Sequence, residues 1–152
     1  MAIPMAIPMA IRYFDASALA KRYVDEPPAA EAERVRRLLG QGLPATSRFS
    51  QIEVASALAR RCREGTISAA DRDRAAAALA KDVSALNVVE LSPEVAALAG
   101  RLLARHPLRA GDALQLASAL LLARKGGGRI EWVACDQRLA EAAAREGLRV
   151  PG

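Results

Sequence analysis

The chain has 152 residues, of which 52% are hydrophobic, 26% are charged and only 3% are aromatic. This composition excludes a disordered chain and favours one domain with an aliphatic core, and no apolar run is long enough to predict a membrane-spanning helix. The 22 basic and 17 acidic residues give a net charge of +5, which permits contacts with nucleic-acid phosphates without requiring them.

Two cysteines, Cys62 and Cys135, and a single histidine, His106, bound the available chemistry. They form no Cys-x-x-Cys pair, so a thiolate–imidazole zinc site is not expected. His106 precedes a proline in a predicted loop, which argues against a histidine-dependent catalytic triad. We expect reduced cysteines and a cytoplasmic location, with no membrane association.

The predicted elements alternate between strands and helices along the chain. Residues 1–10 repeat Met-Ala-Ile-Pro, which suggests a cloning scar or a disordered start, and we expect one domain over residues 11–152. Short β-prone segments predict strands at 11–14, 43–46, 87–91, 130–135 and 148–150. Apolar periodicity and capping residues predict helices at 17–24, 29–39, 50–63, 68–85, 93–106, 112–124 and 137–145. The pattern predicts an α/β domain with a mainly parallel sheet of four to five strands, flanked by helices.

Four acidic residues stand where a predicted strand ends or a predicted helix begins: Asp15, Glu53, Asp112 and Asp136. Each has a structural explanation, because Ser50 and Glu53 form a capping box and the three aspartates can cap the helices that they precede. In a parallel sheet, however, the carboxyl ends of the strands share one edge, where ligands bind. We therefore expect the four carboxylates to meet at that edge.

Clustered carboxylates need a compensating charge. Two of them about 4 Å apart repel by roughly 4 kcal/mol at an effective dielectric of about 20. Oxygen ligands without histidine or cysteine favour a hard cation, Mg²⁺ or Mn²⁺. Such a site suits phosphodiester hydrolysis, because a bound divalent ion activates water and stabilises charge on a phosphate. One ion or two could serve.

Other polar residues near these junctions are candidates for supporting roles. The hydroxyls of Ser17, Thr46 and Ser47 could orient a carboxylate or a water, and Ser17 could instead be an ordinary helix-start residue. Five basic residues could hold an RNA backbone or could be solvated surface charges: Arg12, Arg48, Arg109, Lys21 and Arg22.

The segments FDASALAKRYVDEP, SQIEVASALAR, RAGDALQLASAL and VACDQRLAEAAAREGL resemble the acidic motifs of PIN-domain ribonucleases, above all VapC-type toxins of toxin–antitoxin pairs. The resemblance spans residues 11–150. It implies that Asp15 and Asp112 bind the metal directly. It also implies that Glu53 completes the site or helps to activate water, and that Asp136 binds the metal directly or through water. Ser17 matches a hydroxyl position that often follows the first acid.

The same resemblance implies a Mg²⁺- or Mn²⁺-dependent endoribonuclease that cleaves single-stranded regions of structured RNA. It further implies a homodimer and a cognate VapB-like antitoxin that blocks the site. One departure is Ala134, because many relatives carry Thr or Ser two residues before the fourth acid. This departure removes a hydroxyl that could support Asp136.

Three alternatives come from other classes. A haloacid-dehalogenase-like phosphatase usually has a general acid two residues after its first aspartate, where this chain has Ser17. A phospho-receiver domain needs adjacent acids after the first strand, which are not evident. The stronger alternative is a non-catalytic PIN-like binding or scaffold module.

Overall fold

A computed structural model describes residues 1–2, 9–25, 28–126 and 129–151 of the chain. Its sheet has four parallel strands in the order β3-β2-β1-β4. The strands are β1 (Ile11–Phe14), β2 (Leu43–Ser47), β3 (Asn87–Val89) and β4 (Ile130–Val133). Beyond β4, Arg149 forms a single parallel bridge with Glu131, so the predicted strand at 148–150 is reduced to one residue pair. The predicted α/β fold with a parallel sheet is confirmed.

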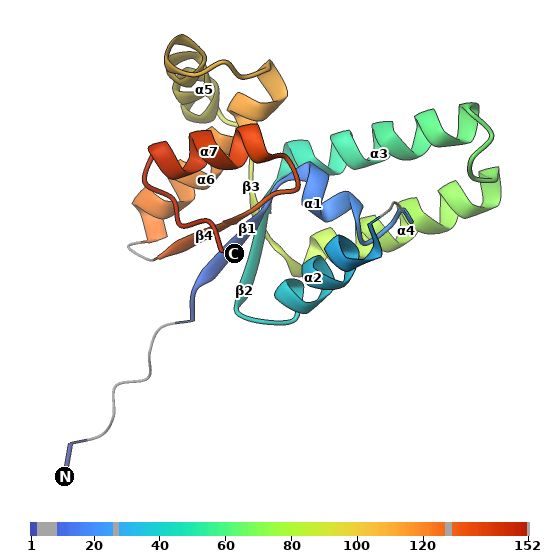
Figure 1. Ribbon diagram of the computed structural model, residues 1–152, viewed down its shortest axis with the longest axis horizontal. Coiled ribbons are helices and arrows are strands. Elements are labelled where there is room, and N and C mark those ends of the chain that lie inside the picture. Colours follow the sequence, from blue (N-terminus) through green and yellow to red (C-terminus); the bar gives the residue numbers. More distant parts are fainter. Residues whose placement is uncertain (3–8, 26–27, 127–128, 152) are drawn as a thin grey trace.

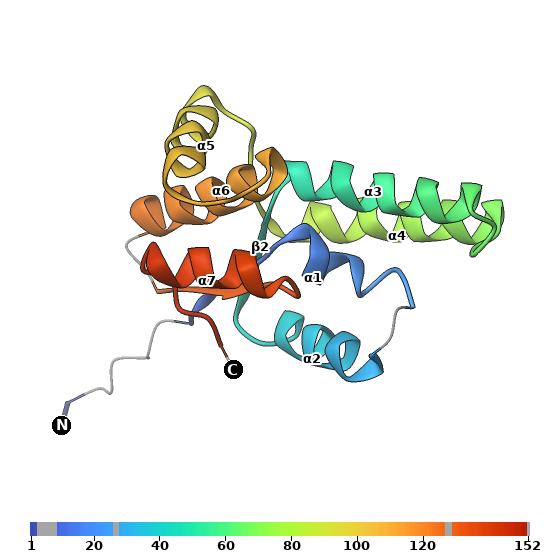
Figure 2. The ribbon, with the colours of Figure 1, turned by 45° about the horizontal axis from the view of Figure 1, so that its top comes forward.

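Seven helices are present in the described part of the chain: α1 (Ala16–Ala20), α2 (Ala29–Leu39), α3 (Arg48–Arg63), α4 (Ala69–Ala85), α5 (Pro93–Arg105), α6 (Ala110–Gly126) and α7 (Gln137–Arg145). Helices α6 and α7 cover one face of the sheet, with α5 packed on the outside of α6, and α1 and α2 cover the other face. Helices α3 and α4 pack together as an arm that extends away from the sheet (Figures 1 and 2).

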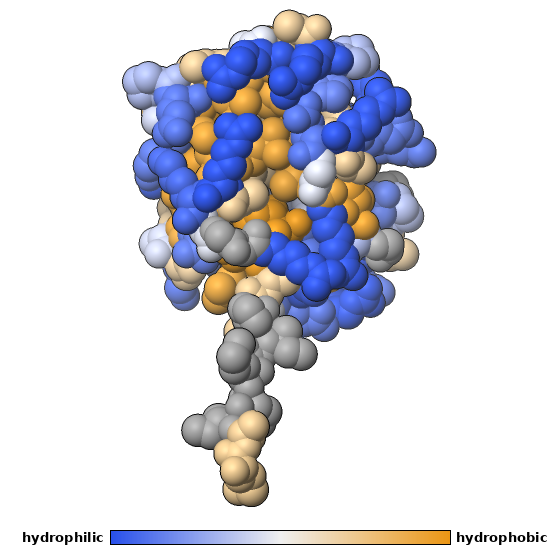
Figure 3. Space-filling view, turned by 90° about the vertical axis from the view of Figure 1, so that its left-hand side faces the viewer, coloured by the Kyte–Doolittle hydropathy of each residue, from blue (hydrophilic) through white to orange (hydrophobic). Residues whose placement is uncertain are grey.

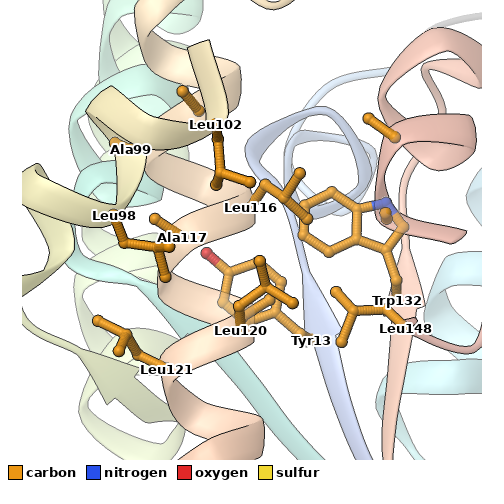
Figure 4. Packing of buried hydrophobic residues seen from close by; sticks show 14 of the residues in the cluster. Tyr13, Leu98, Ala99, Leu102, Leu116, Ala117, Leu120, Leu121, Trp132 and Leu148 are labelled. Atoms are coloured by element: carbon orange, nitrogen blue, oxygen red, sulfur yellow. The ribbon is translucent and has the colours of Figure 1, made fainter. Parts of the chain in front are cut away.

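The main core lies between the sheet and α6. Tyr13 of β1 and Trp132 of β4 are register partners, and their rings stack with centroids 5.3 Å apart and planes inclined by 10°. Leu116 and Leu120 of α6 pack against this pair (Figure 4). Because α6 lies between the sheet and α5, it is apolar on most of its circumference, as expected for a central buried helix.

Two predicted helix starts are wrong by two residues each. Helix α3 begins at Arg48, because the Ser47 side chain caps it by accepting from the Phe49 N–H at 3.1 Å. Ser50 is therefore a fully buried residue inside the helix, and the predicted capping box of Ser50 and Glu53 does not exist. Helix α6 begins at Ala110 rather than at Asp112.

Helix α1 ends at Ala20, before the predicted end near the Pro27–Pro28 pair. Residues 21–24 form turns instead. Their backbone hydrogen bonds include a donation from Lys21 N–H to the carbonyl of Ala18. The short helix brings Lys21 back toward α2, where its ammonium group pairs with Glu31.

Residues 3–8 of the N-terminal repeat lie outside the described residues, so the prediction for that segment stays a prediction. Ala10, at the end of the repeat, already bonds to β2, since its carbonyl accepts from the Leu43 N–H at 3.2 Å. Gly42 makes this approach possible: it has φ +78°, and a Cβ atom there would lie 2.7 Å from the Ala10 carbonyl oxygen.

The surface is mixed rather than uniformly polar. Seen from the side of α5, α6 and α7, hydrophobic surface is visible between hydrophilic residues (Figure 3). None of the helices in the described ranges is both long and apolar enough to cross a bilayer.

Candidate active site

The carboxyl ends of β1 and β4 form a crevice at one edge of the sheet. The two strands are neighbours, and the helices that follow them, α1 and α7, pack on opposite faces. Such a reversal in strand order leaves a gap between the departing chains, which is where ligands bind in open parallel sheets. Asp15 follows β1 and Asp136 follows β4, so both acids stand at this crevice.

Asp15 is the most buried of the four acids, with 3% of its surface exposed. Its carboxylate caps α1 by accepting from the Ala18 N–H at 2.9 Å. The Ser17 hydroxyl lies 2.8 Å and 3.0 Å from its two oxygens. Burial raises the pKa of Asp15 to about 7, and the nearby charges of Glu53 and Asp136 act in the same direction. The Ala18 and Ser17 hydrogen bonds partly oppose this rise.

Ser17 joins the two sides of the crevice. Its hydroxyl oxygen accepts from the Cys135 N–H at 3.1 Å, while its proton points to Asp15. Ser17, in the first turn of α1, is therefore hydrogen-bonded to the loop that follows β4. Ser17 thus contacts a carboxylate, and its supporting role in the site stays a prediction.

Glu53 approaches the site from α3 and contacts α6. The side-chain amide of Gln115 donates to one Glu53 oxygen at 2.7 Å. The other oxygen lies beside Gly111, where a Cβ atom would be only 3.0 Å away. Burial raises the pKa of Glu53, the Gln115 hydrogen bond lowers it, and the charge of Asp112 raises it.

Asp112 and Asp136 both accept a backbone hydrogen bond near the start of a helix. Asp112 lies in the first turn of α6 and accepts from the Arg109 N–H at 3.1 Å, so it reaches back to the residue before the helix. The prediction that Asp112 is the N-cap residue of this helix is therefore wrong, because Asp112 lies inside the helix. Asp136 does cap α7, by accepting from the Leu139 N–H at 3.2 Å.

The four acids form a connected electrostatic series. The charges of Asp136 and Glu53 raise the pKa of Asp15, and the charge of Asp112 raises the pKa of Glu53. All donors in this series are carboxylate oxygens, and the charged groups that shift the Asp15 pKa are themselves anionic. This donor chemistry fits a hard divalent cation.

The series is not a closed ligand set. Within the described ranges, no three Asp, Glu, His or Cys side chains are gathered closely enough to hold a metal ion by themselves. Mg²⁺ commonly keeps several waters and binds one or two carboxylates together with substrate phosphates, so the residues present fit it.

Most of the predicted RNA-binding cations already have anionic partners. The ion pairs are Arg12 with Glu131, Arg48 with Glu90, Arg22 with Asp82, and Lys21 with Glu31. Arg12 also donates to the Gln41 carbonyl, before β2, which directs it away from the acidic edge. Arg109 is exposed next to Asp112.

A cavity of about 520 Å³ opens beside the acids, between α1 and α3. Its lining residues are Ala16, Ser17, Ala20, Lys21, Glu31, Glu53, Ser56, Ala57, Arg60 and Cys135. Ser17 and Glu53 contribute the acidic-site end, whereas Lys21 and Arg60 add positive charge. Arg60 was not among the predicted residues, although its spacing of seven residues from Glu53 places both on one face of α3.

The hydroxyls of Thr46 and Ser47 do not touch a carboxylate in the described structure. Thr46 donates to the Phe14 carbonyl at 2.7 Å, and Ser47 caps α3. Gln115 is the residue that reaches Glu53 instead, and it was not among the residues predicted for the site. The available signal was a lone amide side chain within an otherwise apolar helical stretch.

Residues 12–145 match the PIN domain, so the chain belongs to the PIN-domain family. Its relatives include ribonuclease VapC45 from Mycobacterium tuberculosis strain CDC 1551 / Oshkosh and ribonuclease VapC49 from strain H37Rv. Each is 34% identical over 144 residues, which cover 93% of this chain and 95% of the relative. The predicted family is therefore confirmed.

Solved structures share the fold. Mycobacterium tuberculosis VapC20, a toxin that cleaves the sarcin–ricin loop, has a TM-score of 0.63 at 23% identity and covers 86% of this chain and 94% of its own. DNA-bound VapBC from Salmonella typhimurium has a TM-score of 0.61 at 16% identity and covers 94% and 98%. PAE2754 from Pyrobaculum aerophilum has a TM-score of 0.58 at 22% identity and covers 88% and 86%.

Proposed function

We propose that this chain is a metal-dependent endoribonuclease that hydrolyses phosphodiester bonds in RNA, acting as the toxin of a VapBC-type toxin–antitoxin pair. The observation that carries the proposal is the buried carboxylate of Asp15 at the strand crevice, with Glu53 and Asp136 as its charged neighbours. The 34% identity to VapC ribonucleases supports the same activity.

Asp15 and Asp112 would hold Mg²⁺ or Mn²⁺, with Glu53 and Asp136 completing the site directly or through water. A divalent cation, when bound, supplies Lewis-acid activation of water and neutralises charge at the attacked phosphate. Ser17 orients Asp15 through its hydroxyl. Arg60, at the cavity between α1 and α3, is placed to contact the RNA backbone.

Single-stranded regions of structured RNA are the proposed substrate class. A VapB-like antitoxin is the proposed partner, because solved relatives from Salmonella typhimurium and Rickettsia felis are VapBC complexes. A homodimer and a cytoplasmic location stay predictions. Co-purification with the product of a small neighbouring reading frame, and loss of RNA cleavage in that complex, would test the partner.

The activity is tested on purified protein with structured RNA. We expect cleavage with Mg²⁺ or Mn²⁺ and none with EDTA. Asp112→Asn should reduce the rate by about 10- to 100-fold or more, because it removes a carboxylate from the site. Asp73→Asn, an exposed change on α4, is the matched control and should keep the wild-type rate.

Cleavage that survives both EDTA and Asp112→Asn would contradict the proposed mechanism. Inactivity of the wild type across a broad panel of RNAs would favour the alternative, a PIN-like binding or scaffold module.

A further inference from the structure

A buried polar cluster lies beneath the acidic site. It consists of Tyr13, Thr46, Ser50 and Gln115, which come from β1, β2, α3 and α6. Their exposed fractions are between 0% and 2%. Polar groups are costly to bury unless they are hydrogen-bonded, so a cluster of this kind within an aliphatic core calls for an explanation.

The hydrogen bonds of the cluster converge on Gln115. The Tyr13 hydroxyl donates to its Oε1 at 2.6 Å, and its Nε2 lies 2.9 Å from the Ser50 hydroxyl. The same Nε2 donates to Oε2 of Glu53 at 2.7 Å. Glu53 is the member of this chain of contacts that lines the cavity, so the buried cluster reaches the site through this one amide.

Chemistry determines which way the Gln115 amide faces. An ionised carboxylate can only accept hydrogen bonds, so the NH₂ group must point to Glu53. The amide oxygen must then face Tyr13, whose phenol is a donor. Burial raises the pKa of Tyr13 well above its usual value, so this phenol keeps its proton. Tyr13 therefore selects the amide orientation that suits a carboxylate.

A second residue of α6, Gly111, restricts the position of the Glu53 carboxylate. Gly111 lies one turn before Gln115 on α6, and a Cβ atom at Gly111 would be 3.0 Å from Glu53 Oε1. One carboxylate oxygen is thus held by Gln115, and the other rests against bare backbone. Helix α6 also carries Asp112, so it sets the Glu53–Asp112 relationship directly.

We propose that Gln115, oriented by Tyr13, is a positioning residue that holds the Glu53 carboxylate between Asp15 and Asp112 for the reaction. The inference rests on the proposed ribonuclease function. Gln115 does not line the cavity, so it acts through Glu53 and not on RNA. Its role is separable from stability because the effect must disappear once the Glu53 carboxylate is gone.

The test is a double-mutant cycle with Gln115→Leu, Glu53→Gln and the double variant. We expect Gln115→Leu to lower kcat by roughly 10- to 100-fold, as is common when the partner of a site carboxylate is removed. In the Glu53→Gln background the same change should alter kcat by less than about twofold, since coupled residues are non-additive. Mn²⁺ affinity, measured without RNA by electron paramagnetic resonance, provides a second cycle.

Two further variants guard against a loss of folding. Leu121→Val trims another buried side chain of α6 that packs in the apolar core and makes no hydrogen bond to the cluster, and its kcat should match the wild type. Thermal unfolding shows whether Gln115→Leu is folded. Tyr13→Phe keeps the ring and removes only the donor, and it should lower kcat in the wild-type background alone.

Non-additive effects in either cycle support the assignment. Additive effects of Gln115→Leu and Glu53→Gln on both kcat and Mn²⁺ affinity would overturn it and make Gln115 an ordinary core residue. A wild type that cleaves no RNA would instead refute the proposed function, and the Mn²⁺ cycle would still decide whether Gln115 holds Glu53.

Discussion

The Asp15 carboxylate differs from its three acidic neighbours in how little water reaches it. Its pKa of about 7 lies above the ordinary value of 3.8, because burial disfavours the ionised form. The folded state therefore binds a proton more tightly than the unfolded state between these two values. Without metal, this group reduces the free energy of unfolding as pH rises from about 4 to 7, and the reduction is complete above pH 7.

Asp15→Asn should consequently stabilise the metal-free protein at high pH. Asparagine can still accept from the Ala18 N–H, but it carries no charge to desolvate. We expect a gain on the order of 2 kcal/mol at pH 8 and less than about half of that near pH 4.5. Urea unfolding in EDTA at both pH values measures it. An equal gain at the two pH values would contradict the assigned pKa.

Gly111 offers a change of position without a change of chemistry. In Gly111→Ala the new methyl group would meet Glu53 Oε1 at 3.0 Å and the Phe49 ring at 3.1 Å, so the carboxylate must move by a few tenths of an ångström. Alanine favours helix over glycine by up to about 1 kcal/mol, which offsets the crowding. We expect near-wild-type thermal stability with kcat reduced by about tenfold or more.

Gly100→Ala on α5 is the matched control for this substitution. A Cβ atom at Gly100 would have no neighbour within 4 Å, so only the helix preference changes. Its melting temperature should rise slightly and its kcat should stay the same. A Gly111→Ala enzyme with unchanged kcat would show that the exact place of Glu53 is unimportant.

At the scale of a single element, helix α3 connects the acidic site to the cavity, because it carries both Glu53 and Arg60. It starts directly after β2, because Ser47 ends the strand and caps the helix at once. Glu53 and Arg60 then lie on one face, about 10 Å apart along the axis at roughly 1.5 Å per residue. The helix thereby spaces a negative and a positive group along the cavity.

Arg60→Ala should weaken RNA binding more than chemistry. We expect KM to rise several-fold with kcat nearly unchanged. The slope of log(kcat/KM) against log salt concentration should become shallower by about one, the value for one phosphate contact. Rates measured over a series of KCl concentrations provide both numbers. Arg101→Ala, an exposed change on α5 outside the cavity lining, should leave them unaltered. Equal effects of the two substitutions would indicate general surface charge instead.

At the scale of the whole molecule, alternation of strands and helices was enough to predict a parallel sheet. Helix starts were harder, because Ser47 and Ser50 are both good caps and both are buried in the folded protein, where Ser47 is the one that accepts from a first-turn N–H. Glu131, the ion-pair partner of Arg12, lies 119 residues away in the sequence. Local sequence therefore does not show that Arg12 points away from the acidic site. The family is confirmed, whereas the metal-binding roles of Asp15, Glu53, Asp112 and Asp136 stay predictions.

Ser17 has a consequence for how the crevice responds to its contents. Its oxygen accepts from the Cys135 N–H, so its single proton is left for Asp15. The separation of the two strand ends and the charge state inside the crevice are therefore coupled through one rotatable O–H bond. Any event that draws the Asp15 carboxylate toward a cation would also pull on the loop after β4, and hence on Asp136.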